Sequence, residues 1–440
     1  MSAGGLGPPQ TPQVEGLRPG KGMYLYPPSP LQRAGRQGFA LGRRRICSLP
    51  ARWSGLGGYD LAMSMSPRAE RLARARKAMA DRGVEAVLVG PSADFRWLTG
   101  YLPPGLERLT MLVVPADGDA RLVVPALEAP LALEHLGDLE VEVLAWQETD
   151  DPVALVRDAL RAAGAEAGPL AVGDQLWSAF LLRLQAALPS AGFTTASTVT
   201  RPLRSVKDPD EVEALARVAT AIDRVVDGLG ELRWSGRSER ELAREIDAAI
   251  RAEHDETLFV IVGAGPNSAS PHHVPGDRVI RPGDPVVVDI GGRLDGYGSD
   301  TTRTLVVGEP PPGFSELYQA LQTAQAAGCE AAVPGVPAEQ VDAACRGIIA
   351  AAGHGEHFIH RTGHGIGLEE HEDPYIVAGN RERLVEGMAF SVEPGIYLPG
   401  RFGARIEDIV VCAAPAAGPA AEPGARRLNR TSRDLRVVPG

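Results

Sequence analysis

The chain has 440 residues, which is too long for one ordinary domain and fits two or three. Its charged fraction of 23% and hydrophobic fraction of 44% are those of a globular chain, which excludes wholesale disorder and fibrous repeats. A net charge of −11 argues against a nucleic-acid partner, because phosphates need a basic face. No apolar run approaches the length of about 18 residues needed to cross a bilayer, so we expect no membrane partner. The four cysteines form no CxxC pair, which favours a reduced, cytoplasmic setting.

Residues 1–65 differ from the rest in composition. They contain eight basic and two acidic side chains, 12 glycines and 8 prolines, and so carry a net charge of +6. Such a segment cannot bury enough apolar surface to offset the entropy of ordering, so we predict a disordered basic extension. Two alternatives are an arginine-rich targeting signal and a true translation start at Met63 or Met65.

From Ser66 onward, short apolar runs alternate with amphipathic stretches. Ser66 and Pro67 are typical of a helix start, and that helix should end near Arg82. The predicted strands are 86–89, 110–114, 122–124, 141–144 and 170–172, and the predicted helices are 126–136, 151–164 and 175–188. The alternation predicts a smaller α/β domain with a mixed sheet over residues 66–200. This part has no glycine-rich phosphate loop, so we expect a structural or regulatory role.

The polar stretch 201–209 predicts a hinge, with the domain boundary near residue 201. Apolar positions at helical spacing predict helices at 208–230 and 237–252. Beyond them, hairpin-like segments alternate with further helices. The second domain, 201–440, is therefore predicted to be α+β.

Two aspartates follow apolar stretches on either side of a turn signal. Asp289 ends one such stretch, Asp300 follows eleven residues later, and Asp295-Gly296 between them is typical of a two-residue hairpin turn. A hairpin folded there places Asp289 and Asp300 side by side on neighbouring strands. Two buried carboxylates repel each other unless a cation or a proton lies between them. The pair alone fits a metal site and two solvent-facing turn residues equally well.

Later segments contain further residues of the metal-binding type. Segment 358–367 is rich in glycine and contains His360 and His364, and the glycines beside His364 allow the backbone to approach a site closely. Glu393 and Glu407 each stand among apolar neighbours in strand-like segments, where a lone glutamate usually faces solvent. These residues therefore indicate a metal site only in combination with the two aspartates.

The combined set offers four carboxylates and one imidazole: Asp289, Asp300, His364, Glu393 and Glu407. Its charge of −4, with histidine neutral, would be balanced by two divalent cations. Oxygen-rich ligation with one nitrogen favours Mn²⁺, Co²⁺, Fe²⁺ or Zn²⁺ over a thiolate-loving metal. Two such ions about 3.5–4 Å apart can hold a hydroxide between them, which is a nucleophile for hydrolysis.

This set resembles the ligands of the pita-bread dinuclear metallopeptidases, and within them the prolidase and Xaa-Pro aminopeptidase (aminopeptidase P) branch. The order Asp, Asp, His, Glu, Glu, with gaps of 11, 64, 29 and 14 residues, matches that branch. Local contexts match as well, at 204–207, 288–291, 299–303, 363–367, 392–397 and 405–408. The resemblance covers about residues 66–437. It implies an α+β fold in which a pita-bread catalytic domain is preceded by a smaller α/β domain of the creatinase/prolidase type.

The resemblance also implies roles for the ligands. The five divide between two ions: Asp289 on the first, His364 and Glu393 on the second, and Asp300 and Glu407 bridging both. Glu393 would carry a proton during catalysis as well. Arg405 is expected to orient the Glu407 carboxylate or to contact the substrate. Manganese is the first choice of metal, with cobalt, zinc and iron as the alternatives, because the ligand types narrow the identity without selecting it.

Three histidines match family positions near the ligands. His272 resembles the histidine that closes over the substrate and stabilises the reacting carbonyl. His360 and His371 resemble the pair that binds the proline-side residue and assists proton transfer, work that suits a ring with a pKa near neutrality. His273, beside His272, has no counterpart and is interpreted as a bystander.

The activity implied by the resemblance is hydrolysis of the Xaa-Pro bond, with release of the residue that precedes proline. Whether the enzyme is a Xaa-Pro aminopeptidase or a Xaa-Pro dipeptidase stays open, because that depends on what blocks the far end of the site. The implied partners are a proline-containing peptide and further copies of the chain, as a dimer or a tetramer.

Three alternative functions would be compatible with parts of this pattern. Creatinase-like relatives hydrolyse a C–N bond without metal and lack several of the ligands. Methionine aminopeptidases have similar ligands but no α/β domain ahead of them. Some relatives use the same fold as a non-enzymatic protein-binding module, against which the intact ligand set argues.

Overall fold

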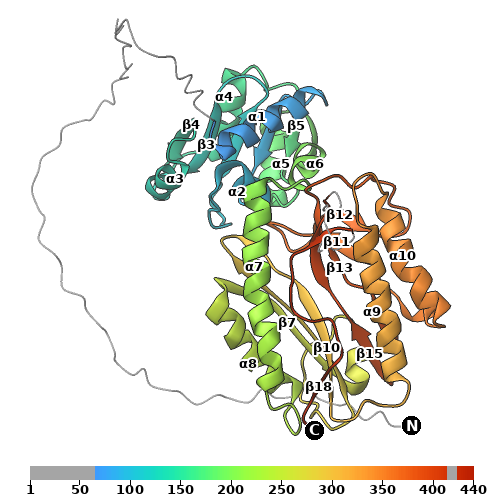
Figure 1. The fold of residues 1–440 in the computed structure, drawn as a ribbon. Coiled ribbons are helices and arrows are strands. Elements are labelled where there is room, and N and C mark those ends of the chain that lie inside the picture. Colours follow the sequence, from blue (N-terminus) through green and yellow to red (C-terminus); the bar gives the residue numbers. More distant parts are fainter. Residues whose placement is uncertain (1–64, 414–423) are drawn as a thin grey trace, which may run out of the picture. The chain divides into compact units, whose positions relative to one another are not determined.

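The computed structural model describes residues 65–413 and 424–440, so the expected basic extension lies outside the described residues except for Met65. The described residues form a six-stranded sheet, two five-stranded sheets and a two-stranded ribbon (Figure 1). None of the described helices has both the length and the apolar character that a membrane span requires.

The six-stranded sheet belongs to the amino-terminal part, and its strand order is β4-β3-β2-β1-β5-β6. The strands are β1 (Ala86–Val89), β2 (Met111–Pro115), β3 (Ala120–Pro125), β4 (Val141–Trp146), β5 (Pro169–Val172) and β6 (Gly192–Thr195). Strand β2 is antiparallel to β1 and β3, whereas β1–β5, β5–β6 and β3–β4 are parallel pairs. The predicted mixed sheet is confirmed.

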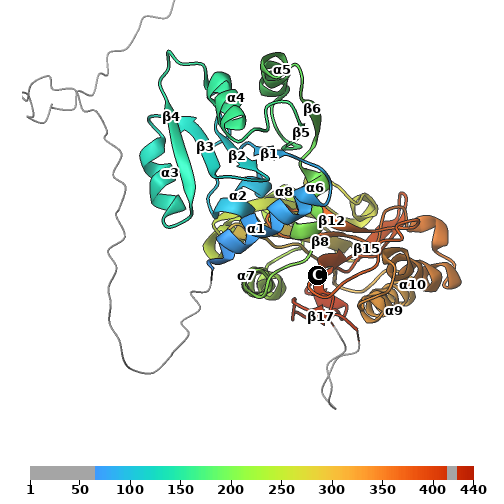
Figure 2. The same ribbon diagram turned by 90° about the horizontal axis from the view of Figure 1, so that it is seen from above.

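Helices cover both faces of this sheet, as Figure 2 shows. They are α1 (Pro67–Ala80), α2 (Ala93–Thr99), α3 (Ala129–Leu136), α4 (Pro152–Ala162), α5 (Ser178–Ala187) and α6 (Ser197–Arg204). Val87 and Val89 of β1 pack into the core with α1, α2 and α3. The alternate residues Ala86 and Leu88 pack into the core with α4 and α5. Successive side chains of a strand point to opposite faces, so this purely apolar strand serves two cores.

One prediction for this region is wrong in part, and two short elements escaped prediction. The stretch 201–209 is not a hinge throughout, because α6 continues to Arg204. Val199 and Thr200 of α6 are buried, and this packing outweighs the polar residues that suggested a loop. Helix α2 and strand β6 carry no clear periodic pattern, being only 7 and 4 residues long, and were not predicted.

The carboxy-terminal part begins with two helices that pack on its first sheet. Helices α7 (Pro209–Gly228) and α8 (Glu239–Glu253) lie close to their predicted ranges. The sheet has the order β18-β10-β8-β7, and β9 pairs with β8. Its strands are β7 (Glu256–Ala264), β8 (Pro285–Leu294), β9 (Tyr297–Gly298), β10 (Thr301–Val307) and β18 (Arg436–Val438). Apolar residues of α7 and α8, such as Ile222 and Ile246, share one core with this sheet.

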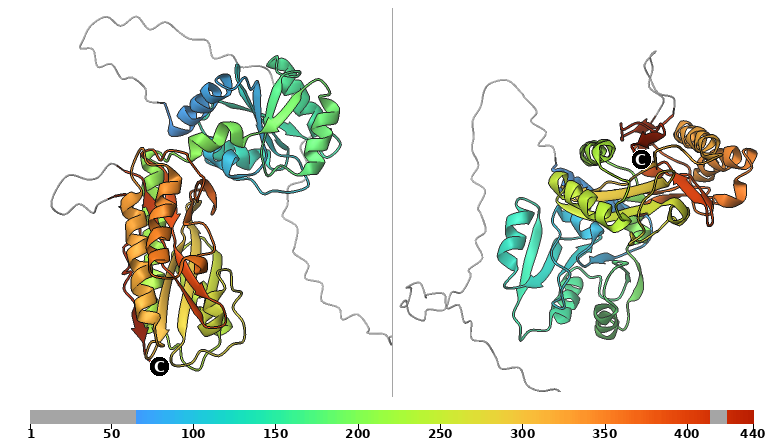
Figure 3. Two further views of the ribbon diagram at one scale, coloured as in Figure 1. Left: turned by 90° about the vertical axis from the view of Figure 1, so that its right-hand side faces the viewer. Right: turned by 90° about the horizontal axis from the view of Figure 1, so that it is seen from below.

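The second sheet has the order β12-β11-β13-β16-β17 and is accompanied by the ribbon β14-β15. These strands are β11 (Gly363–Gly365), β12 (Glu372–Ile376), β13 (Ala389–Val392), β14 (Gly395–Leu398), β15 (Phe402–Arg405), β16 (Asp408–Val411) and β17 (Arg426–Arg427). Helices α9 (Phe314–Ala331) and α10 (Ala338–Ala351) run side by side over them (Figure 3). Their buried residues share the largest core with β13, β14 and β15. Helices and sheets thus alternate as predicted for an α+β part.

Candidate metal centre

The hairpin that carries the two aspartates has the predicted turn. Asp295 has a φ of 52° and Gly296 a φ of 88°, and a type I′ turn requires positive values at both positions. Across the strands, Asp289 pairs with Thr302, two residues beyond Asp300. The two aspartates therefore form a diagonal pair, and their side chains lie on one face of the sheet.

The other three residues come from strands of the second sheet and from the connection between β15 and β16. His364 is the middle residue of β11, Glu393 directly follows β13, and Glu407 lies between β15 and β16. Gly363 and Gly365 leave no room for a side chain, because a Cβ there would collide with main-chain atoms of neighbouring strands. The strands can approach this closely only because both residues beside His364 are glycine.

The structure brings all five predicted ligands together, although they span 119 positions of the chain. Asp289, Asp300 and Glu407 form one group of potential ligand atoms, and His364, Glu393 and Glu407 form another. Within each group the atoms lie within 4.8 Å of one another. Nε2 of His364 lies 3.5 Å from Oδ2 of Asp300 and 3.4 Å from Oε1 of Glu393.

Two properties of the five residues show whether they suit cations: how deeply they are buried, and whether their oxygens have hydrogen-bond partners. Oδ1 of Asp289 and Oε1 of Glu407 are buried and have no hydrogen-bond partner among the described residues. Burial, followed by the charges of Asp289 and Glu393, raises the pKa of Asp300 well above its ordinary value. Burial and the charge of Asp300 also raise the pKa of Glu407. Divalent cations would relieve the repulsion and satisfy the unpaired oxygens, so the residues fit a two-metal site.

Arg405 makes hydrogen bonds that orient the carboxylates of the site. Its Nη2 donates to Oδ2 of Asp289 at 2.6 Å, and its Nε donates to Oγ1 of Thr302 at 3.0 Å. Thr302 in turn donates to Oε2 of Glu407 at 2.7 Å. Arg405 therefore orients Asp289 directly and Glu407 through a hydroxyl group, and each of these carboxylates keeps its second oxygen for a ligand.

His360 is joined to Arg405 by a tyrosine. Nη1 of Arg405 lies 2.8 Å from the Tyr397 hydroxyl, which lies 2.8 Å from Nε2 of His360. Nδ1 of His360 faces the carbonyl oxygen of Arg361 at 2.7 Å. Since a carbonyl can only accept, Nδ1 of His360 carries a proton, and in the neutral ring Nε2 accepts from the tyrosine O–H. Burial lowers the pKa of His360, in agreement with this assignment.

His371 lies against His364. The His364 and His371 ring centroids are 3.9 Å apart. Arg361 donates to Nδ1 of His371 at 3.3 Å, which leaves the proton of the neutral ring on Nε2. Burial, His364 and Arg361 lower the pKa of His371 to about 4. At neutral pH this ring is an uncharged hydrogen-bond donor.

A cavity of about 650 Å³ opens beside the five residues. His272, His360 and His371 all line it, so the three predicted histidines face one space. His272 is exposed and comes from the loop between β7 and β8. Phe259 and Ile261 of β7 supply an apolar wall.

Two residues of the site were missed from the sequence. Glu370 adds a fifth carboxylate to the cavity wall, and burial raises its pKa. Tyr397 was noted only as part of a matching segment, without a role. An acidic residue directly before His371 was the one available signal for Glu370, whereas nothing in the sequence links Tyr397 to His360.

The geometry agrees with comparisons to known families. Residues 212–414 match the model of metallopeptidase family M24, and residues 71–206 match that of the creatinase/prolidase N-terminal domain. The chain belongs to the M24 metallopeptidases, with an amino-terminal creatinase/prolidase domain followed by a pita-bread domain. It is thus an enzyme of a peptidase family whose activity depends on metal.

Individual relatives carry more specific names. The chain is 48% identical to "Probable dipeptidase PepE" of Mycobacterium tuberculosis over 84% of its own length and 96% of the relative. It is 36% identical to the Xaa-Pro dipeptidase of Lactobacillus helveticus, over 78% of the chain and 92% of the relative. Among solved structures, dipeptidase PepE of Mycobacterium ulcerans has a TM-score of 0.78 and 47% identity, covering 87% of this chain and all of that one. A prolidase of Thermococcus sibiricus has a TM-score of 0.77 and 37% identity, covering 85% of this chain and all of that one.

Proposed function

We propose that this enzyme is a metal-dependent Xaa-Pro dipeptidase. The observation that carries the proposal is the pair of buried, unpartnered oxygens, Oδ1 of Asp289 and Oε1 of Glu407, within a cluster of five ligand-type residues. Asp289 would hold one ion, Asp300 and Glu407 would bridge, and His364 with Glu393 would hold the second. Bound divalent cations supply Lewis acidity and make water a stronger acid.

The chain's own groups would move the protons. Glu393 is less buried than the other carboxylates and receives a hydrogen bond from Ser391 at 3.1 Å, so one of its oxygens is oriented. It would take a proton from the attacking water and pass it to the proline nitrogen, which leaves as an amine. His371, neutral with its proton on Nε2, would donate to the oxygen that becomes negative in the tetrahedral intermediate. His272, on the loop after β7, would help to stabilise the same oxygen.

The His360–Tyr397–Arg405 chain would hold the substrate side of the cavity in a fixed protonation state. Because His360 is neutral and receives the tyrosine proton, its ring presents an uncharged face to the proline residue. A rigid, apolar ring would suit the proline side chain, which has no N–H to satisfy in a peptide.

The dipeptide preference is supported by the relatives named dipeptidase and Xaa-Pro dipeptidase. Manganese is our first choice of metal because four carboxylates and one imidazole suit an oxygen-preferring ion. We further propose a cytoplasmic enzyme that works as a homo-oligomer.

A single panel of assays tests this function. The purified chain, stripped with a chelator, is refilled with Mn²⁺, Co²⁺, Zn²⁺ or Fe²⁺, and its metal content is measured by mass spectrometry. Leu-Pro, Leu-Pro-Gly and Leu-Ala are then compared as substrates. We expect two metal ions per chain and the fastest hydrolysis with Leu-Pro.

Each alternative has its own outcome. Faster cleavage of Leu-Pro-Gly would make the enzyme an aminopeptidase. Activity that survives both chelation and Asp300→Asn would favour a metal-free hydrolase of the creatinase type. A protein that binds neither metal nor substrate would favour a binding module.

A further inference from the structure

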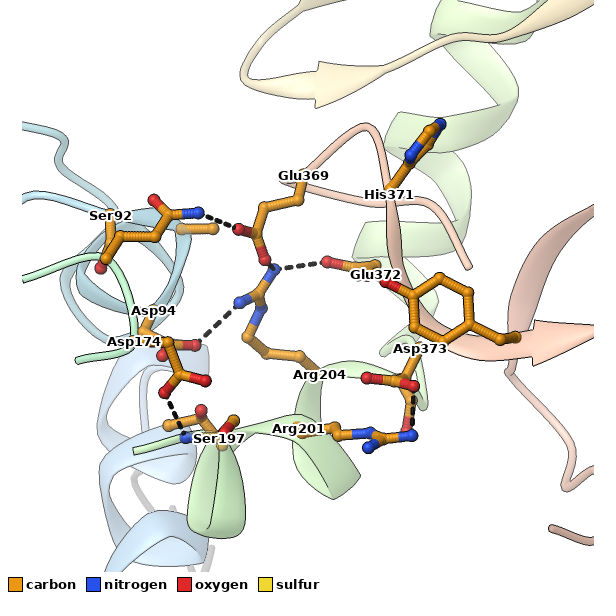
Figure 4. Close-up of a pocket in the computed structure, with 15 residues that line it drawn as sticks. Ser92, Asp94, Asp174, Ser197, Arg201, Arg204, Glu369, His371, Glu372 and Asp373 are labelled. Carbon is orange, nitrogen blue, oxygen red and sulfur yellow. Dashed lines mark hydrogen bonds and ion pairs between the residues drawn. The ribbon is translucent and has the colours of Figure 1, made fainter. Parts of the chain in front are cut away.

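Residues 369–372, which end with the first residue of β12, line three cavities, among them that of the candidate metal centre. Glu370 and His371 line the cavity of the candidate metal centre. Glu369 and Glu372, which bracket them in the chain, line a second cavity of about 220 Å³, and His371 lines that cavity as well (Figure 4). Glu370 and His371 are therefore flanked in the chain by two carboxylates, Glu369 and Glu372, that make their contacts at the second cavity.

One guanidinium fixes both bracketing carboxylates. Figure 4 shows Arg204 between them, and its Nη2 donates to Oε2 of Glu369 at 2.8 Å and to Oε2 of Glu372 in a shorter contact. Its Nη1 donates to Oδ1 of Asp94 at 2.8 Å. The donors of a guanidinium lie in one rigid plane, so a single arginine can set the spacing of three carboxylates.

The side chains around Arg204 are buried, and their opposite charges are paired with one another. The Arg204 side chain is 10% exposed, and Asp94 and Glu372 are buried as well. Lys207 donates to Oε1 of Glu372 and, at 2.7 Å, to the carbonyl oxygen of Arg204. Removing one partner from such a group leaves a buried charge uncompensated, so the geometry resists change.

Two of the contacts come from the amino-terminal α/β part. Asp94 belongs to α2, and Gln175 follows β5. Nε2 of Gln175 donates to Oε1 of Glu369 at 2.6 Å. Both oxygens of Glu369 are thereby occupied, one by Arg204 and one by Gln175.

We infer that Arg204 is a positioning residue that clamps Glu369 and Glu372 against Asp94 and so keeps His371 in place beside His364, at the cavity of the candidate metal centre. The amino-terminal part thus controls turnover through the clamp. The inference rests on the proposed function, because one of its readouts is peptidase turnover. A misplacement of about 1 Å at a reacting group can lower the rate about 100-fold, so a loosened clamp should be visible in kcat.

The main test is Arg204→Lys with Arg71→Lys as a matched control. Lysine keeps the charge but cannot span three carboxylates. Arg71 is equally buried, with 11% of its side chain exposed, and pairs with Asp208 at 3.2 Å, away from the segment 369–372. We expect kcat to fall by at least about 10-fold in Arg204→Lys, with a smaller change in KM and unchanged metal content. Arg71→Lys should stay within about twofold of the wild-type kcat.

A milder pair of variants covers the case in which Arg204→Lys does not fold. Gln175→Ala removes one exposed contact to Glu369, and Asp174→Asn changes the neighbouring residue, which accepts from the backbone of Ser197 at 3.0 Å. We expect Gln175→Ala to lower kcat about twofold to fivefold and Asp174→Asn to leave it unchanged. Hydrogen exchange of the amides at 366–372 should be faster in Gln175→Ala than in Asp174→Asn.

Three outcomes would overturn the inference: folded Arg204→Lys with the wild-type kcat, equal losses in Arg204→Lys and Arg71→Lys, or equal amide exchange in the second pair. If the wild-type protein turned over no Xaa-Pro substrate, the proposed function would fail instead. The exchange measurements would then still decide whether the clamp holds the segment.

Discussion

Nε2 of His273 lies 2.8 Å from Oε2 of Glu239, a fully buried carboxylate at the start of α8. Glu239 also accepts from the backbone N–H groups of Ala264 and Gly276, at 2.9 and 3.1 Å. This carboxylate therefore anchors the loop that contains His272, and His272 lines the cavity of the candidate metal centre. His273, interpreted from the sequence as a bystander, is part of that anchor.

Replacing His273 with alanine should loosen the loop. Leaving a buried carboxylate without one of its hydrogen-bond donors should lower the free energy of unfolding by about 1–3 kcal/mol, which a urea titration measures. We expect kcat/KM for Leu-Pro to fall about threefold to tenfold as well, because His272 is held less firmly. His273→Gln keeps a donor and should recover most of both losses. An alanine variant with the wild-type kcat/KM would contradict the anchoring role.

Asp300→Asn should have opposite effects with and without metal. The substitution removes one charge from a buried group of repelling carboxylates, so the metal-free variant should be more stable than the metal-free wild type by about 1–3 kcal/mol. Mn²⁺ should raise the melting temperature of the wild type much more than that of the variant, because only the wild type binds it well. Calorimetry with chelator and with Mn²⁺ should therefore show the order of stability reversing. A metal-free variant less stable than the wild type would argue against repulsion as the dominant effect.

Thr302→Val should weaken metal binding without changing any ligand. The hydroxyl that joins Arg405 to Glu407 is lost, and substitutions of such supporting groups typically lower metal affinity about 10–100-fold. Thr304→Val is the matched control on the same face of β10, since the Thr304 hydroxyl exchanges hydrogen bonds with the backbone of Arg405, at 2.9 and 3.0 Å. Titration calorimetry with Mn²⁺ compares the two. Equal affinities in both variants would show that the hydroxyl does not orient Glu407.

The stability contributed by Glu372 should depend on pH. Burial acts to raise its pKa, but Lys207 and Arg204 outweigh burial and hold the pKa below the ordinary value of 4.5. Since the folded-state pKa is the lower one, the carboxylate stabilises the fold above about pH 4.5 and loses this effect as the pH falls further. Glu372→Gln should therefore lower the melting temperature clearly at neutral pH and less at about pH 3.5. A difference that stays constant with pH would rule out this linkage.

Features set by neighbours in the chain could be predicted. The Asp295-Gly296 pair specifies its own turn, and Ser66 caps its helix by accepting from the backbone of Ala69 at 3.3 Å. Apolar runs specified most strands of the amino-terminal sheet. The convergence of the five predicted ligands required more, because only the resemblance to a known family connected segments as distant as Asp289 and Glu407.

Contacts between distant polar residues could not be predicted. Arg204 meets Asp94 from 110 positions earlier and Glu372 from 168 positions later, and no spacing rule connects them. The same charged residues made 201–209 look like a hinge, since charge without context indicates solvent. Tertiary packing decided otherwise, and with it the position of His371.

The two glycines beside His364 also bear on attempts to alter this enzyme. Main-chain atoms of adjacent strands occupy the space that any larger residue would need at positions 363 and 365. Random libraries aimed at new substrates should therefore spare both codons and vary the apolar wall of Phe259 and Ile261 instead.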